Sequence, residues 1–294
     1  MARPHLRIIP VPALIPQTLA AGMLLVFAAI SAVTVMAGFF RDNADVAGTE
    51  VTQLPEDLVP DVGSSAPDEG FRLPVLRYRH IGQAGPGQPD AVPPEVLDRQ
   101  LSTLLNSGYT FLTMSDLSDI LDGRAVLPLR PVVLTFDGGY RDFHTDAFPL
   151  IRKYRIPVTL FPPVNLLGRP GHLSVAEVRG AVAGGLVEIG AAGLNYRPLA
   201  GVGLSEVQKE VSGSKNELEK LFRVPVHSFS YPFGALDRAA AGAVAAGGYR
   251  TAVTSAPGAA VSPENRFFLY RISPGNRSGE KLQEYLDRCM SGVC

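Results

Sequence analysis

From residue 73 onward, short apolar runs alternate with segments in which apolar residues recur at helical spacing. Strands are predicted at 73–81, 108–112, 132–136, 157–161, 187–189, 226–231 and 249–253. Helical stripes are carried by three sets of residues: Leu97, Leu101, Leu104 and Leu105; Val207, Val211, Leu218 and Leu221; and Leu282, Tyr285, Leu286 and Cys289. Ser174-Val175-Ala176-Glu177 has the form of a capping box. The alternation predicts an α/β fold made of parallel βα units.

Three short motifs begin where predicted strands end. They are Thr-Phe-Asp-Gly-Gly at 135–139, the segment 188–196, and Phe-Ser-Tyr-Pro-Phe-Gly at 229–234. Taken alone, an Asp after an apolar strand is often a turn or helix-cap residue, and Tyr-Pro-Phe-Gly would be an ordinary turn. However, the carboxyl ends of parallel strands in a barrel lie on one face, and barrel enzymes carry their chemistry there. We therefore expect the three motifs to meet at the mouth of an irregular barrel.

Together these motifs resemble those of the NodB-type polysaccharide deacetylases (carbohydrate esterase family four), in the exopolysaccharide deacetylase-like branch. The resemblance runs over about residues 73–275. The family's first motif is Thr-Phe-Asp-Asp-Gly and its third is Tyr-Pro-Tyr-Gly. Its opening strand, Pro-Val-Leu-Met-Tyr-His, corresponds to 74–79, where Arg79 replaces the His. The resemblance implies an irregular (β/α) barrel and the removal of N- or O-linked acetyl groups from a glycan by metal-activated water.

Several residues acquire a role through this resemblance. Asp137 would be the base, and the backbone N–H of Phe233 would help to hold the oxyanion. Arg271 could orient Asp137 or form a surface salt bridge, and Glu188 would anchor its loop. Sugar rings would contact Tyr231, Phe233 and Tyr196. If Asp137 faces the groove, Asp137→Asn should not greatly lower the melting temperature.

The three metal-ligand positions of the family hold other residues in this chain. The second Asp of the first motif is replaced by Gly138, and the two His of the second motif by Ala192 and Tyr196. Because a carboxylate and two imidazoles hold the divalent metal in the family, we expect no metal at this site. If the scaffold kept its shape, Gly138→Asp, Ala192→His and Tyr196→His together should restore metal binding.

A rearranged metal site remains an alternative. The chain has five histidines, at positions 5, 80, 144, 172 and 227. The first precedes the membrane segment and the last opens a predicted strand, away from its carboxyl end. A divalent metal such as zinc would therefore have to use His80, His144 or His172 together with Asp137 or Asp142.

The N-terminal region predicts a location. Residues 1–18 would be a short cytoplasmic N-terminus, and residues 19–40 a single transmembrane helix, because about 20 uncharged, mainly apolar residues suffice to span a bilayer. Arg3 and Arg7 favour a cytoplasmic start. Val35-Met36-Ala37 leaves a cleaved signal peptide open, although the apolar run is longer than usual for one. In both cases the following domain would lie outside the cytoplasm, and an uncleaved segment would anchor it in the cell membrane.

The rest of the chain divides into a linker at 41–72 and a domain at 73–294. Between residues 42 and 69 the linker has eight Asp or Glu and no Lys or Arg, and it lacks apolar periodicity, so we expect a solvated, extended tether. The formal net charge of −1 and the absence of a dense basic run give no reason to expect nucleic acid as a partner. Cys289 could be a buried thiol, or it could pair with Cys294 if the compartment is oxidising.

The leading interpretation is a membrane-anchored, extracytoplasmic relative of the polysaccharide deacetylases, in bacterial cell-envelope or exopolysaccharide metabolism. It would bind a polysaccharide, an acetylated amino-sugar glycan, and be catalytically impaired. Two alternatives stay open: an active N- or O-deacetylase with a rearranged or metal-free site, and a structural membrane partner with a vestigial groove. The sequence therefore leaves undecided whether the chain is a hydrolase of acetylated carbohydrate.

Overall fold

The computed structural model of the protein describes residues 70–83, 85, 88 and 90–294. The predicted N-terminus at 1–18, the predicted membrane segment at 19–40 and nearly all of the linker at 41–72 lie outside these residues. Within the described part of the chain, no helix is both long enough and apolar enough to cross a membrane.

The described strands form an irregular barrel. Parallel pairing runs in the order β2 (Val75–Tyr78), β4 (Pro131–Asp137), β5 (Val158–Phe161) and β6 (Val187–Ile189), while β3 (Thr110–Leu112) pairs with the first half of β4. A bridge from Ala191 to Phe229 continues the circle to β7 (Ser228–Ser230) and β8 (Thr251–Val253). Bridges Val253–Leu269 and Leu76–Ile272 then lead back to β2. The predicted parallel α/β barrel is therefore present in the structure.

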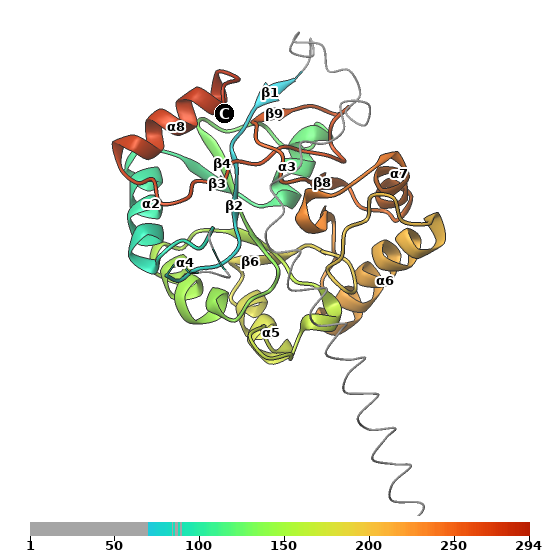
Figure 1. Cartoon of the computed structure of the whole chain (residues 1–294). Helices are drawn as coiled ribbons and strands as arrows, with labels where there is room; N and C mark the ends of the chain where they lie inside the picture. The colour runs from blue at the N-terminus through green and yellow to red at the C-terminus, as the bar shows by residue number, and fades with distance from the viewer. Residues whose placement is uncertain (1–69, 84, 86–87, 89) are drawn as a thin grey trace, which may run out of the picture. The chain divides into compact units, whose positions relative to one another are not determined.

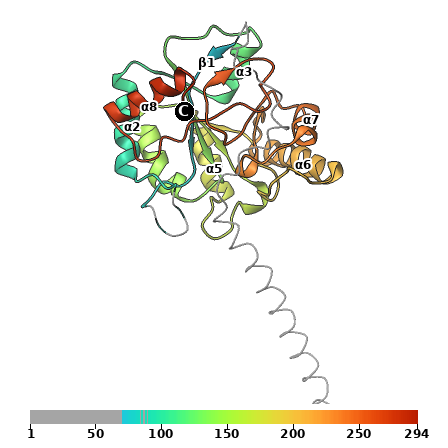
Figure 2. The same ribbon diagram turned by 45° about the horizontal axis from the view of Figure 1, so that its top comes forward.

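Helices surround this barrel in Figure 1, and the view in Figure 2 shows α8 beside α2 as well. They are α2 (Pro94–Asn106), α4 (Phe148–Tyr154), α5 (Val175–Ala183), α6 (Leu204–Phe222), α7 (Arg238–Ala246) and α8 (Glu280–Met290). Most predicted stripe residues are buried against the strands, whereas Leu105 is 36% exposed and faces outward. The capping box is confirmed, because Ser174 and Glu177 exchange side-chain and backbone hydrogen bonds at the start of α5.

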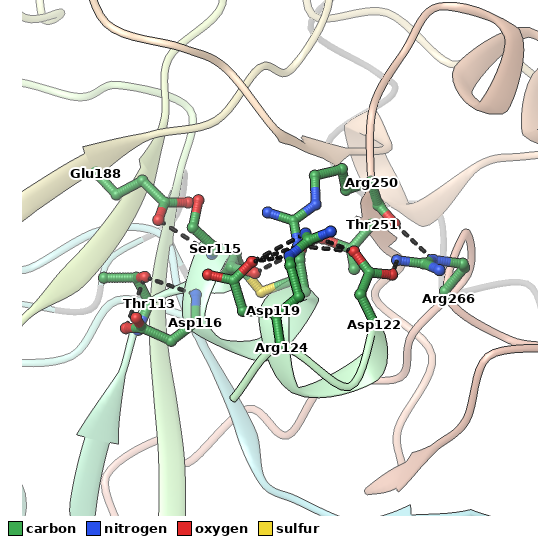
Figure 3. A network of polar contacts seen from close by, with 12 residues as sticks. Thr113, Ser115, Asp116, Asp119, Asp122, Arg124, Glu188, Arg250, Thr251 and Arg266 are labelled. Carbon is green, nitrogen blue, oxygen red and sulfur yellow. Dashed lines mark hydrogen bonds and ion pairs between the residues drawn. The ribbon is translucent and has the colours of Figure 1, made fainter. Parts of the chain in front are cut away.

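Helix α3 (Met114–Leu121) packs into the barrel end opposite the motifs. Met114 and Leu117 are fully buried in the interior apolar cluster. The Ser115 N–H donates to Glu188 Oε2 at 3.1 Å, so Glu188 binds the start of α3 rather than its own loop. At the end of the helix, an ionic cluster of Asp119, Asp122, Arg124, Arg250 and Arg266 links α3 to the residue before β8 and to the loop after it (Figure 3). These ion pairs link α3 to the segments at either end of β8.

Smaller elements complete the domain. Strand β1 (Phe71–Arg72) pairs antiparallel with β9 (Ala260–Val261), and short helical turns occur at η2 (Phe143–Ala147), η3 (Val164–Leu166) and η4 (Pro232–Gly234). Cys289, at the buried face of α8, forms a disulfide with Cys294, so the alternative of a free buried thiol is wrong.

Candidate functional site

Asp137 is held at the carboxyl end of β4 by two neighbouring residues. The residue is 6% exposed, and its two carboxylate oxygens receive parallel hydrogen bonds from Arg271, Nη1 to Oδ1 at 2.9 Å and Nη2 to Oδ2 at 2.7 Å. The Ser230 hydroxyl, at the end of β7, adds a bond to Oδ1 at 3.0 Å. Charge-assisted, bidentate bonds of this kind fix geometry as well as charge.

Arg271 is itself fully enclosed. It is 2% exposed, and its remaining N–H groups donate to the Thr254 carbonyl at 2.7 Å and to the Thr135 hydroxyl at 3.1 Å. Of the two roles predicted for Arg271, the structure therefore supports the orientation of Asp137, and a surface salt bridge is wrong. Because both charges are buried, the condition attached to the melting-temperature expectation for Asp137→Asn is not met, and we expect this variant to be destabilised.

The position of the family's metal-binding Asp is closed to a side chain. Gly138 has φ +86°, a backbone conformation that L-residues rarely adopt, and a Cβ added there would lie within 3.0 Å of Tyr140 ring atoms. Tyr140 is locked in place, because its hydroxyl accepts from Arg79 Nη2 at 3.1 Å and its ring packs on His80 with centroids 3.8 Å apart. The Tyr140 ring thus takes the space beside Asp137.

The other two ligand positions also offer no suitable donor. Ala192 is fully buried in the interior apolar cluster with Phe161 and Val253. Tyr196 has φ +53°, and burial, with the nearby Asp137 carboxylate, raises the pKa of its phenol, so it stays neutral. Gly138, Ala192 and Tyr196 therefore do not fit a divalent metal at the family's site.

The aromatic residues predicted to contact sugar rings divide into two groups. Phe233 is 48% exposed and its ring lies 5.2 Å from that of Tyr196, so both could offer apolar surface. Tyr231 is 1% exposed and donates its hydroxyl to the Phe267 carbonyl at 2.9 Å. The prediction that Tyr231 contacts substrate is therefore wrong, because its side chain turns inward and packs against Phe229. Phe233 has φ +59°, and its backbone follows the end of β7 as predicted.

The histidines do not converge on one point. His80 Nδ1 lies 2.8 Å from Asp142 Oδ2, the His144 ring stacks on Phe148, and the His172 ring packs beside Tyr140 at 5.0 Å. His227 precedes β7, at the other end of the barrel, and His5 is outside the described residues. Across residues 70–294, apart from the four undescribed positions, no three His, Cys, Asp or Glu are grouped to hold a metal ion. Of the residues considered for a rearranged metal site, only His80 and Asp142 therefore lie together in the described chain.

A cavity of about 140 Å³ adjoins this site. It is lined by Arg77, Arg79, Asp90, Ala91, Val92, Ser273, Gly275 and Asn276.

Sequence reasoning missed Arg77, Tyr140 and Ser230. The register could have indicated the first, because Arg77 pairs with Thr135 two positions before Asp137 and side chains alternate along a strand. Ser230, as the last residue of a strand, carried a similar signal, whereas nothing in the pattern indicated where the Tyr140 ring would turn.

Fold and site together define an α/β barrel protein with a buried, arginine-bound carboxylate at the carboxyl ends of its strands. The sequence pattern of the polysaccharide deacetylase family matches residues 126–252. "Putative polysaccharide deacetylase YxkH" of Bacillus subtilis is 28% identical over 218 residues, which cover 74% of this chain and 76% of that protein. The poly-beta-1,6-N-acetyl-D-glucosamine N-deacetylase of Escherichia coli is 30% identical over 79 residues, only 12% of its own length.

Solved structures agree on the fold. The Streptococcus pyogenes deacetylase PplD, determined in complex with acetate, has a TM-score of 0.69 at 22% identity and covers 75% of this chain and 99% of that one. IcaB from Ammonifex degensii has a TM-score of 0.64 at 21% identity, with 75% and 98% covered. Residues 126–252 thus form a region that matches the polysaccharide deacetylase family, and the fold of the domain is that of these solved deacetylases.

Proposed function

We propose that this protein is a glycan-binding member of the polysaccharide deacetylase family that has lost the metal-dependent reaction. The observation that carries the proposal is the replacement of all three ligand positions by Gly138, Ala192 and Tyr196, with the Tyr140 ring filling the space beside the first. Without those ligands, the chain has no means at this site to lower the pKa of a water or to polarise an acetyl carbonyl through a metal.

The remaining groups suit recognition of a sugar. Phe233 presents half of its surface to solvent beside Tyr196, and an aromatic face can stack on the apolar face of a sugar ring. Arg271 donates to both oxygens of Asp137, and each carboxylate oxygen can accept more than one hydrogen bond. An acetylated amino-sugar glycan is the proposed ligand, because two curated relatives are named for deacetylation of polysaccharide.

The test uses the full chain, purified in detergent. We expect binding of acetylated chitooligosaccharides by calorimetry, no acetate release from them, and no stoichiometric divalent metal by elemental analysis. Metal-dependent acetate release would overturn the proposal. Absence of any glycan binding would instead favour the structural membrane partner with a vestigial groove.

One observation favours a second candidate, a metal-free deacetylase. Asp142 holds His80 through Nδ1 at 2.8 Å, in the manner in which a carboxylate orients a general base, and this leaves Nε2 to take a proton from water. Acetate release that survives a chelator and is lost in His80→Gln would establish this activity. Release that is unchanged in His80→Gln would exclude it.

The proposed location is outside the cytoplasm, with the chain anchored in the cell membrane by residues 19–40. The apolar length of that segment supports the anchor. The Cys289–Cys294 disulfide supports an oxidising compartment, since cytosolic thiols are usually kept reduced. Fractionation with membranes, release only by detergent, and cleavage of the 41–72 segment by protease added to intact cells would support this placement. A soluble mature protein that begins near Gly38 would show a cleaved signal instead.

A further inference from the structure

The cavity beside Asp137 carries an excess of positive charge. Two guanidinium groups, Arg77 and Arg79, and one carboxylate, Asp90, line it, which gives the lining a net charge of +1. Among the residues that the structure describes, neither arginine forms an ion pair. This is unusual beside a site where Arg271 is matched to Asp137 by two hydrogen bonds.

Strand register brings these arginines to the barrel mouth. In the parallel pairing of β2 with β4, Arg77 lies opposite Thr135 and Tyr78 opposite Phe136, so Arg79 continues to the level of Asp137. Tyr78 and Phe136 stack on each other in the outer core, and the alternation of side chains along a strand places the residues on either side of them on the inner face. Arg77 and Arg79 are thus fixed beside the candidate site by the backbone.

In the part of the chain that the structure describes, each arginine keeps donors that its neighbours do not use. Arg77 is held through Nε, which donates to the Ser273 hydroxyl at 3.0 Å. Its two Nη groups then form the free edge of the planar guanidinium. Arg79 is held through Nη2 by Tyr140, while its buried Nε has no hydrogen-bond partner in the described chain. A buried N–H without an acceptor costs free energy that a bound acceptor would recover.

The electrostatic surroundings of Arg77 would favour a bound anion. Burial and the neighbouring Arg271 guanidinium lower the pKa of Arg77, and Asp137 and Asp90 only partly offset this. An anion placed in the cavity would relieve the repulsion between these two cations. The net charge of +1 is balanced by a single negative charge, and a planar fork of N–H donors matches a carboxylate.

We propose that the cavity lined by Arg77 and Arg79 is a subsite for the carboxylate of a sugar acid, so that the protein binds an acidic glycan containing uronic acid units. This inference rests on the proposed glycan-binding function and names its substrate class. The acidic unit would sit in the cavity, and a neighbouring sugar would extend over Asp137 toward Phe233.

The probes are two tetrasaccharides that differ in acidic groups. Hyaluronan tetrasaccharide alternates N-acetylglucosamine with glucuronic acid, and chitotetraose has only N-acetylglucosamine. With the full chain in detergent, calorimetry should show at least about tenfold tighter binding of the hyaluronan probe, and its methyl ester should lose that preference. The preference should shrink as salt is raised, since the interaction is between charges.

Variants of the cavity residues test whether the preference for the hyaluronan probe arises in the cavity. Arg77→Gln and Arg79→Gln should each abolish the preference and leave chitotetraose binding within about twofold. Arg77→Lys should retain part of it, because the charge remains and the fork is lost. Arg99→Gln, which removes an exposed charge on the outer helix α2, is the matched control and should change nothing. Melting curves would show that each variant is folded.

The outcomes separate the two proposals. Equal binding of both tetrasaccharides overturns the acidic subsite and leaves glycan binding standing. Failure of both to bind overturns both proposals. Displacement of the hyaluronan probe by inorganic phosphate at lower concentration than by free glucuronate would overturn the assignment to a carboxylate and indicate a phosphate subsite instead.

Discussion

The ring of Tyr140 occupies the space into which a side chain at position 138 would have to project. Gly138 can lie under that ring because it has no Cβ, and its φ of +86° would strain any other residue. The absence of a side chain at position 138 and the placement of the Tyr140 ring therefore depend on each other.

Restoring the family's ligands alone should fail for this reason. Gly138→Asp, Ala192→His and Tyr196→His together should lower stability and bind no metal, because Tyr140 blocks the first position and Ala192 is enclosed by core residues. Adding Tyr140→Ala clears only the first position, so zinc affinity measured by calorimetry should rise above that of the triple variant but stay weak, because a His at position 192 still lies among core residues. Tyr140→Ala by itself is the control and should bind none, and stoichiometric zinc in the triple variant would contradict the argument.

Breaking the Asp137–Arg271 pair should be costly, because it leaves a buried charge without a partner. We expect Arg271→Met or Asp137→Leu to lower the free energy of unfolding by about 3–5 kcal/mol in urea titrations. The double variant should lose less than the sum of the two, since no unpaired charge remains. Additive losses would show that the two side chains are energetically independent.

Phe233→Ala should weaken glycan binding without unfolding the domain. An aromatic contact of this size is worth about 1–3 kcal/mol, and the side chain is already 48% exposed. Tyr231→Phe is the matched control: it loses the bond to the Phe267 carbonyl and about 1 kcal/mol of stability, with affinity unchanged. If Tyr231→Phe alone weakened binding, the assignment of the exposed face to Phe233 would be wrong.

Glu188 should make the protein less stable as pH rises. Burial raises the pKa of Glu188 above its ordinary value of 4.5, although hydrogen bonds from Thr113 and Ser115 partly oppose this. The contribution of Glu188 to the free energy of unfolding is therefore fully present below pH 4.5 and is lost as pH rises through the raised pKa. The free energy of unfolding of the wild type minus that of Glu188→Gln should fall across that window, by at most about 1.4 kcal/mol per pH unit.

Glu177→Gln is a control of opposite sign. Hydrogen bonds from Ser174 at the start of α5 lower the pKa of Glu177. Its contribution should be present above its ordinary value and lost as pH falls below it. Parallel pH curves for the two variants would contradict both assignments.

Most of the barrel could be predicted from periodicity. Val158–Phe161 is a strand, as predicted, and this short run is buried on both faces. Val187–Ile189 is also a strand, as predicted, with buried apolar residues on either side of half-buried Glu188. The runs at 226–231 and 249–253 predicted longer strands than β7 and β8. The pairing of β1 with β9 was not predicted, because two-residue strands have no detectable period.

Only the site residues that lie at the ends of strands could be predicted from the sequence. Asp137 and Ser230 end strands, so the barrel dictates that they meet. Tyr231 follows directly after a strand, and alternation cannot tell whether an aromatic ring there turns toward the groove or toward Phe229. The bidentate pairing of Arg271 with Asp137 forms only when the barrel closes and brings distant segments together. No local sequence pattern encodes that closure.

The bridge between Leu76 and Ile272 gives the barrel a seam where its first and last strands meet. Arg77 and Ser273 bond across it although they are 196 positions apart in the chain. A ribosome must therefore deliver almost the whole domain before β2 acquires its second neighbour. Until then, one edge of the nascent sheet stays exposed to other chains. Such long-range closure favours slow folding and a need for chaperones during synthesis. A chain truncated before residue 269 should accordingly aggregate rather than form a smaller barrel.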